Sequence, residues 1–95
     1  MTGGSEARAR VVFRGRVQGV YFRAHCKEKA DELGLRGWVR NLSHGDVEAL
    51  FEGPRELVEA CIEWNKSRQP NAVVTAAEVT WERPTGEFVR FDVRR

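Results

Sequence analysis

The spacing of the apolar residues changes several times along this chain, and this pattern constrains the fold more than any other feature. Residues 8–14 (RARVVFR) alternate between apolar and basic side chains, which is typical of a strand with one buried face. From Phe22 onward the apolar residues recur every three or four positions, as on one face of a helix, until Gly34 ends the pattern. A strand followed by an amphipathic helix is the first half of a β-α-β unit.

The same succession recurs after a central pair of strands. The remaining strands are predicted at residues 36–42, 46–52, 72–81 and 87–93. A short turn that contains Gly45 joins the first two of them. A second helix is predicted to begin at Pro54, because the first helical turn does not use the N–H group that proline lacks.

The predicted order is β-α-β-β-α-β-β, which favours the α+β class. Two β-α-β units around a central hairpin give a ferredoxin-like sandwich, in which an antiparallel sheet of four to five strands carries two helices on one face. The neighbour of the last strand stays open. The polar, glycine-rich residues 1–7 are predicted to be a disordered leader, and residues 8–95 to be a single domain.

Composition excludes several broad classes of protein. No apolar run approaches the roughly 20 residues that a membrane-spanning helix needs, and the start of the chain has no apolar stretch typical of a secretory signal. We therefore expect a soluble cytoplasmic protein without a membrane partner. The formal net charge of +2 is too small to indicate a nucleic acid partner. The two cysteines, Cys26 and Cys61, are predicted to be reduced and partly buried.

The segment 15–23 (GRVQGVYFR) lies between the first strand and the first helix and indicates an anion site. Backbone N–H groups and the positive end of the helix dipole can converge there, and Gly15 and Gly19 let the backbone approach a ligand closely. We expect the side chains of Tyr21 and Phe22 to pack rather than to contact the ligand. The candidate phosphate-binding backbone amides are those of Arg16, Val17, Gln18, Gly19, Val20, Tyr21 and Phe22.

Arg23 stands in the first turn of the predicted helix, where a cation opposes the helix dipole by about 0.3–1 kcal/mol. A phosphate held between Arg23 and the loop N–H groups would remove this conflict, because guanidinium groups bind phosphate oxygens through two parallel hydrogen bonds. Spacing alone leaves two other interpretations open. Arg23 could be exposed without a partner, or it could be paired with a distant carboxylate.

The second candidate residue is Asn41, near the end of the strand predicted at residues 36–42. A side-chain amide both donates and accepts hydrogen bonds, so it can hold a water molecule in one orientation. Asn41 could instead cap the turn that follows, and spacing alone favours that structural role.

Several familiar phosphate and metal sites are not encoded. The chain contains neither GxGxxG nor GxxxxGK followed by Ser or Thr. A cysteine phosphatase is not supported either, because Cys61 belongs to the apolar stripe of the second helix. His25 and His44 stand alone, without the clustered ligands that a metal site needs. We therefore expect no metal and no other cofactor.

Two motifs of the chain resemble the acylphosphatase family: GRVQGVYFR at residues 15–23 and GLRGWVRN at residues 34–41. The resemblance continues through DVEALFEG to PTGEFVRFDV and covers about residues 8–94. It implies a ferredoxin-like fold and a metal-free enzyme. Such an enzyme hydrolyses the carboxyl-phosphate bond of acyl phosphates to a carboxylate and inorganic phosphate.

By this resemblance, the catalytic residues are Arg23 and Asn41. The arginine that ends the first motif binds the substrate phosphate with the loop N–H groups, and the asparagine that ends the second motif orients the attacking water. One position departs from the family: His44 stands where an acidic residue usually precedes the turn glycine, which puts the hydrogen bonding of that turn in question. The natural acyl phosphate is not indicated, and we expect a monomer.

Two alternatives to an enzyme stay open. A domain of this type could hold a phosphate or carboxylate ligand without turnover, although we would then expect Arg23 or Asn41 to be lost. RNA-recognition domains share the ferredoxin-like plan and stack bases on aromatic residues of the sheet. Residues 46–53 (DVEALFEG), however, lack the basic and aromatic consensus of such domains. A small acyl phosphate is the expected partner.

Overall fold

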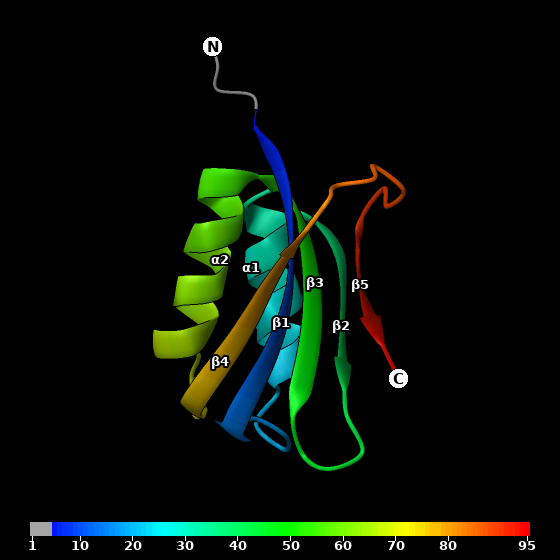
Figure 1. The fold of residues 1–95 in the computed structure, drawn as a ribbon. Coiled ribbons are helices and arrows are strands. Elements are labelled where there is room, and N and C mark those ends of the chain that lie inside the picture. Colours follow the sequence, from blue (N-terminus) through cyan, green and yellow to red (C-terminus); the bar gives the residue numbers. More distant parts are fainter. Residues whose placement is uncertain (1–4) are drawn as a thin grey trace.

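The computed structural model describes residues 5–95 and contains the elements in the predicted order (Figure 1). The elements are β1 (Glu6–Arg16), α1 (Phe22–Glu32), β2 (Arg36–Asn41), β3 (Val47–Pro54), α2 (Arg55–Ser67), β4 (Val73–Glu82) and β5 (Phe91–Arg94). The strands form one sheet in the order β4-β1-β3-β2-β5. Both helices cover the same face of this sheet (Figure 1), so the predicted α+β, ferredoxin-like class is confirmed.

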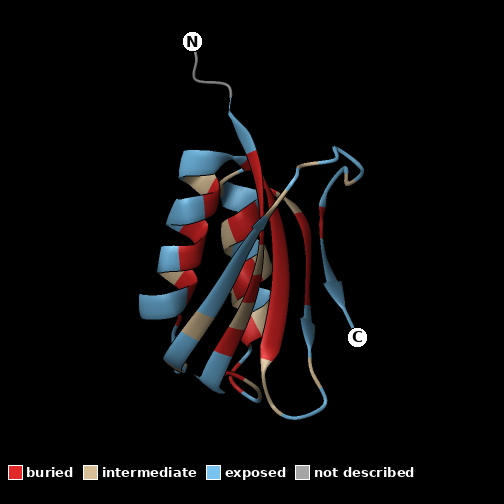
Figure 2. Ribbon diagram, in the orientation of Figure 1, coloured by how far each residue is buried: buried red, intermediate tan, exposed pale blue. Residues whose placement is uncertain are grey.

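The core lies between the sheet and the helices, as the distribution of buried residues shows (Figure 2). Alternate residues of β1 (Ala9, Val11 and Phe13) are fully buried, and they form the face that the alternation predicted. The rings of Phe13 and Phe22 pack with 5.2 Å between their centroids. Because Phe22 is the first residue of α1, this contact fixes the start of the helix against the sheet.

The last strand departs from the prediction in both position and direction. Strand β5 occupies Phe91–Arg94 rather than residues 87–93. It pairs with β2 in parallel, so the sheet is mixed, whereas all its other strand pairs are antiparallel. The parallel pairing follows from the topology, because β4 lies at one edge of the sheet and residues 83–90 carry the chain to the other edge.

A buried carboxylate holds that crossing segment in a loop. Glu52 on β3 is 1% exposed, and it accepts hydrogen bonds from the backbone N–H groups of Thr85 at 2.6 Å and Gly86 at 3.0 Å. Gly86 has a φ of 73°, in the left-handed region that glycine adopts without strain. The N–H groups bound by Glu52 cannot enter the strand ladder, so residues 85 and 86 form part of the connection to β5, which begins at Phe91.

The described chain becomes regular before the predicted boundary at residue 8. Residues 1–4 of the predicted leader lie outside the described residues. Glu6 and Ala7 belong to β1 and pair with the last residues of β3, and Ala7 is buried. The leader prediction is corrected at these positions, because a single small alanine is a weak apolar signal in a polar segment. Within residues 5–95, neither helix is long and apolar enough to cross a membrane.

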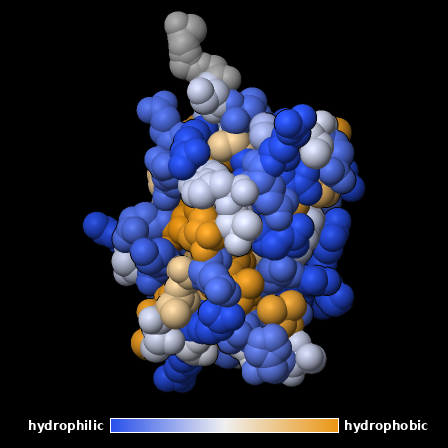
Figure 3. Space-filling model, in the orientation of Figure 1, coloured by the Kyte–Doolittle hydropathy of each residue, from blue (hydrophilic) through white to orange (hydrophobic). Residues whose placement is uncertain are grey.

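The face of the sheet that the helices leave open is largely hydrophilic, with scattered hydrophobic patches (Figure 3). Its central aromatic residue, Trp38, is only 5% exposed. Three guanidinium groups cover its ring: the Cζ atoms of Arg94, Arg40 and Arg10 lie 4.8, 5.2 and 5.6 Å from a ring centroid of Trp38. Ion pairs with Glu48 hold Arg10 and Arg40 in place.

Strand β2 requires glycine at position 37. Gly37 has a φ of 136°, and a Cβ atom there would collide with the backbone carbonyl of Leu50 on β3. We expect Gly37→Ala to lower the free energy of unfolding by about 3–5 kcal/mol, from the collision and the backbone strain together. Urea unfolding measures this loss.

Gly34 provides the matched control for this substitution. Its φ is also positive, at 70°, but no atom lies within 4 Å of the position that a Cβ would take. Gly34→Ala should therefore lower the free energy of unfolding by only about 1–2 kcal/mol. Equal losses in the two variants would contradict the steric explanation for Gly37.

The helices each contribute one buried free thiol to the core, Cys26 from α1 and Cys61 from α2. Burial raises the pKa of Cys61 from 9.0 to about 12, and burial together with the nearby Cys61 raises the pKa of Cys26 well above 9.0. Both thiols are more deeply buried than predicted. Because the thiolate is the nucleophile, neither cysteine is a reactive group near neutral pH.

These thiols should make the fold less stable in alkaline solution. An unfolded chain loses the cysteine proton above a pKa of 9.0, whereas folded Cys61 keeps its proton up to about pH 12. The unfolded state then binds fewer protons, so Cys61 lowers the free energy of unfolding by up to about 1.4 kcal/mol per pH unit in this window. Urea unfolding between about pH 8 and about pH 11 measures the slope. It should become shallower in Cys61→Ala, and an identical slope would contradict the role of this thiol.

Candidate active site

Three segments meet at one end of the sheet: the loop after β1, the first turn of α1 and the turn between β2 and β3 (Figure 1). The loop, the first turn of α1, the end of β2 and the end of the chain line a pocket of about 450 Å³. The lining residues are Val17, Gln18, Gly19, Tyr21, Phe22, Arg23, Ala24, Asn41, Val93 and Arg95. The fold therefore brings the two candidate catalytic residues, Arg23 and Asn41, to one cavity.

The loop between β1 and α1 carries unpaired hydrogen-bond donors. Among the described residues, no backbone carbonyl accepts from the N–H groups of residues 17–22. The side chains of Val17, Val20 and Phe22 pack into the core, and these residues are at most 7% exposed. Unpaired donors that lead into a helix N-terminus form the arrangement that binds phosphate.

The guanidinium of Arg23 is oriented by the last strand. Its Nη1 atom donates a hydrogen bond of 2.9 Å to the backbone carbonyl of Arg94. Within residues 5–95 no other acceptor binds Arg23, so donors remain for a two-pronged contact with phosphate. The first turn of α1 contains no acidic residue, so Arg23 and the helix dipole attract an anion together. Arg23 therefore has a hydrogen-bond partner, and this partner is a backbone carbonyl rather than a carboxylate. Neither of the two other interpretations of Arg23 matches this geometry.

The side chain of Gln18 ties the phosphate loop to the turn between β2 and β3. Its amide nitrogen donates to the backbone carbonyl of Leu42 at 2.8 Å and to that of Asp46 at 2.9 Å. Leu42 directly follows Asn41, so these bonds set the position of the loop relative to the strand end that carries Asn41. Sequence reasoning assigned only the backbone amide of Gln18 to the site, because a contact between distant segments leaves no mark in local spacing.

Asn41 is the last residue of β2, and it is exposed at the pocket. The turn after it is closed by backbone hydrogen bonds, from Leu42 N–H to the Asp46 carbonyl at 2.8 Å and from Gly45 N–H to the Leu42 carbonyl at 3.2 Å. Among the described residues, no hydrogen bond of this turn comes from the side chain of Asn41. The turn-capping alternative is therefore not supported, and the amide is free to bind water.

The histidine that departs from the family pattern does not disturb this turn. The Nε2 atom of His44 lies 2.9 Å from a carboxylate oxygen of Asp46. The same oxygen also lies 3.3 Å from Nε of Arg14 on β1. The turn thus has a carboxylate directly after Gly45, that of Asp46, and the backbone hydrogen bonds of the turn are intact.

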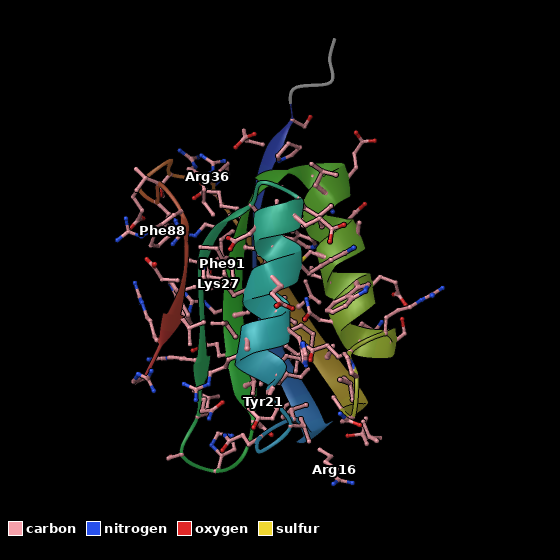
Figure 4. All side chains as sticks on the ribbon, turned by 180° about the vertical axis from the view of Figure 1, so that it is seen from behind. Arg16, Tyr21, Lys27, Arg36, Phe88 and Phe91 are labelled. Carbon is pink, nitrogen blue, oxygen red and sulfur yellow. The ribbon has the colours of Figure 1, made fainter. Side chains whose placement is uncertain are left out.

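Two predicted phosphate-loop residues do not line the pocket. Arg16 ends β1 with an exposed side chain (Figure 4), and Val20 is buried. The assignments of their backbone amides stay predictions. Phe22 packs in the core as expected, but Tyr21 is 79% exposed, so the predicted packing role of Tyr21 is wrong.

Three lining residues were missed by sequence reasoning: Ala24, Val93 and Arg95. Ala24 sits in the first turn of α1 next to Arg23, and its small size gives no signal. Val93 and Arg95 reach the pocket because β5 runs parallel to β2 toward the end that carries Asn41. That strand neighbour was the open part of the predicted topology.

The pocket contains no acidic residue and no histidine among its lining residues. Within residues 5–95, no three His, Cys, Asp or Glu side chains gather as ligands for a metal ion. The charge at the site is therefore positive and comes from arginine and backbone N–H groups. Such a site favours an anionic ligand.

Comparison with known proteins agrees with this geometry. The family model described as Acylphosphatase matches residues 9–93. An acylphosphatase of Roseiflexus sp. is 51% identical over 87 residues, which cover 92% of this chain and 94% of that protein. The chain belongs to the acylphosphatase family.

Other acylphosphatases support the same assignment. That of Pelotomaculum thermopropionicum is 47% identical over 89 residues and covers 94% of this chain and 97% of its own length. The crystal structure of acylphosphatase from Bacillus subtilis superimposes with a TM-score of 0.89 at 37% identity and covers 94% of this chain and 99% of that one. As an acylphosphatase, the chain is a hydrolase that acts on a small acyl phosphate and releases phosphate.

Proposed function

We propose that this pocket hydrolyses acyl phosphates by direct attack of water on phosphorus. Arg23 and the backbone N–H groups of residues 16–22 hold the phosphoryl group, and Asn41 orients the water. One observation carries the proposal: a single pocket joins unpaired loop donors at a helix N-terminus, a guanidinium with free donors and an exposed amide.

The reaction needs little machinery. The water oxygen forms a bond to phosphorus, and the bond from phosphorus to the bridging oxygen breaks, with its electron pair leaving on the carboxylate. A carboxylate is a stable anion, so no strong general acid is required. The transition state is loose and spreads negative charge over the phosphoryl oxygens. Arg23 and the loop N–H groups stabilise that charge from fixed positions.

The proton of the attacking water passes to a phosphoryl oxygen of the substrate. No side chain with an ordinary pKa near neutrality lines the pocket, and the phosphoryl oxygens are the nearest bases to a water that attacks phosphorus. The products are then a free carboxylate and a protonated phosphate, so atoms and charges balance. Neither a metal nor another cofactor takes part in this scheme.

The proposed setting is a cytoplasmic monomer whose partner is the small substrate rather than a nucleic acid or a membrane. The open face of the sheet does not favour RNA binding, because Trp38 is covered by arginine side chains and only 5% exposed. Those arginines are in part neutralised by ion pairs with glutamates. Base stacking would require an accessible aromatic face.

Acetyl phosphate hydrolysis in the presence of excess chelator tests the proposed function. We expect the purified protein to release phosphate far above the uncatalysed rate, and the rate to be unaffected by the chelator. Phosphate that binds without any turnover would instead indicate a binding module. A rate that disappears with chelator would overturn the metal-free scheme alone.

A further inference from the structure

Tyr21 combines two features that the fold itself does not require. It directly precedes α1 with φ 59° and ψ 28°, a left-handed conformation that residues other than glycine and asparagine seldom adopt. Its side chain caps no helix N–H group and is 79% exposed. Strained backbone conformations of this kind cluster at active sites and at ligand-binding sites.

Tyr21 lies at the mouth of the phosphate pocket. It stands at the start of α1, at the end of the molecule where β1 also ends (Figure 4), and it is a lining residue of the cavity. The other exposed apolar side chains in that lining are Val93 of β5, at 37% exposure, and the small Ala24 of α1. Val17 and Phe22 also line the cavity but are buried, so they offer little surface to a ligand.

The pocket has more room than a phosphoryl group needs. Its volume of about 450 Å³ lies within the range of small-molecule sites. Once the phosphoryl group occupies the loop N–H groups and Arg23, the remaining lining is available to the rest of the substrate. The exposed part of that lining includes the aromatic ring of Tyr21 and the aliphatic side chain of Val93.

We propose that Tyr21 is a specificity-determining residue that binds the acyl group, and that it favours aromatic or large apolar acyl phosphates over acetyl phosphate. This inference rests on the proposed function of the pocket. The ring of Tyr21 offers an accessible face to an aromatic acyl group, and offset or edge-to-face contacts between aromatic rings are favourable. An acetyl group has too little apolar surface to gain from the same contact.

The test compares benzoyl phosphate with acetyl phosphate. Tyr21→Gly and Tyr21→Asn remove the ring and suit the left-handed backbone, so both variants should fold. We expect the ratio of kcat/KM for benzoyl phosphate to kcat/KM for acetyl phosphate to fall about tenfold in both variants. Tyr21→Phe keeps the ring and should keep the wild-type ratio.

The outcomes separate this inference from the function on which it rests. If the wild-type protein hydrolyses neither compound, the proposed function fails. If it hydrolyses both, and the ratio is the same in the ringless variants as in the wild type, the role of Tyr21 alone is overturned. A ratio that falls equally in Tyr21→Phe would also overturn it, because the hydroxyl and not the ring would then select the substrate.

Discussion

Replacement of Arg23 by alanine is expected to lower kcat/KM for acyl phosphate hydrolysis by at least about 10³-fold. Loss of one well-placed hydrogen-bond donor to a developing charge usually lowers the rate by about 10²–10³-fold, and Arg23 also carries a full positive charge. Inhibition by inorganic phosphate should weaken in the same variant, because the guanidinium would bind the ground state as well. Steady-state kinetics with benzoyl phosphate, with phosphate as inhibitor, measures both effects.

Two further variants make this result interpretable. Arg23→Lys keeps the charge but loses the planar fork, so it should recover only part of the lost activity. Arg90→Ala removes an exposed arginine that pairs with Asp92 and does not line the pocket, and it should retain wild-type activity. An Arg23→Ala variant with more than about one tenth of wild-type activity would contradict the assignment, since the loss would then be far smaller than that of a single fixed donor.

The stability of the Arg23→Ala variant provides a second test of the role of Arg23. The side chain of Arg23 places a cation at the positive end of α1, where no acidic residue compensates it. Its removal should therefore raise the free energy of unfolding by about 0.3–1 kcal/mol. Loss of its hydrogen bond to the Arg94 carbonyl acts in the opposite direction, so the net change should be zero or a small increase. Loss of activity without loss of stability is the signature of a residue placed for function.

Asn41→Ala is expected to lower kcat by about 10²-fold while inhibition by phosphate stays close to that of the wild type. The amide is proposed to hold the attacking water, which matters in the transition state and little for phosphate already bound. A fall in kcat with an unchanged inhibition constant for phosphate thus distinguishes Asn41 from Arg23. Both constants come from the same kinetic measurements on each variant.

Ser43→Ala is the matched control for this substitution, because Ser43 is an exposed residue of the same turn and does not line the pocket. It should keep wild-type kcat. If Asn41→Ala instead keeps wild-type kcat and loses stability, then Asn41 is a structural turn residue. The water-orienting role would be wrong in that case.

The fold could be predicted from the sequence because its signals are local. Alternation in β1 and helical spacing from Phe22 onward depend only on neighbours in the chain, and the structure has its buried residues on those faces. The pocket that joins Arg23 to the loop could also be predicted, since two glycines and an arginine between a strand and a helix already place donors at a helix N-terminus.

The rest depends on contacts between distant segments. The loop before β5 is held by Glu52, which binds its backbone N–H groups at residues 85–86, and β5 itself pairs with the distant strand β2. The link from Gln18 to the turn near Asn41 joins residues far apart in sequence. The left-handed backbone of Tyr21 and the exposure of its side chain were not predicted either, because the residue types of the loop do not specify its φ angle. Local periodicity carries none of this information.

The position of the bond that breaks tests the central claim most directly. Hydrolysis of benzoyl phosphate in water enriched in oxygen-18, under single-turnover conditions, labels whichever atom the water attacks. If Arg23 and the loop hold the phosphoryl group while Asn41 directs water at phosphorus, the label must appear in the inorganic phosphate and not in the benzoate. Label in the benzoate would mean that water attacks the carbonyl carbon, and the assignment of the pocket would be contradicted.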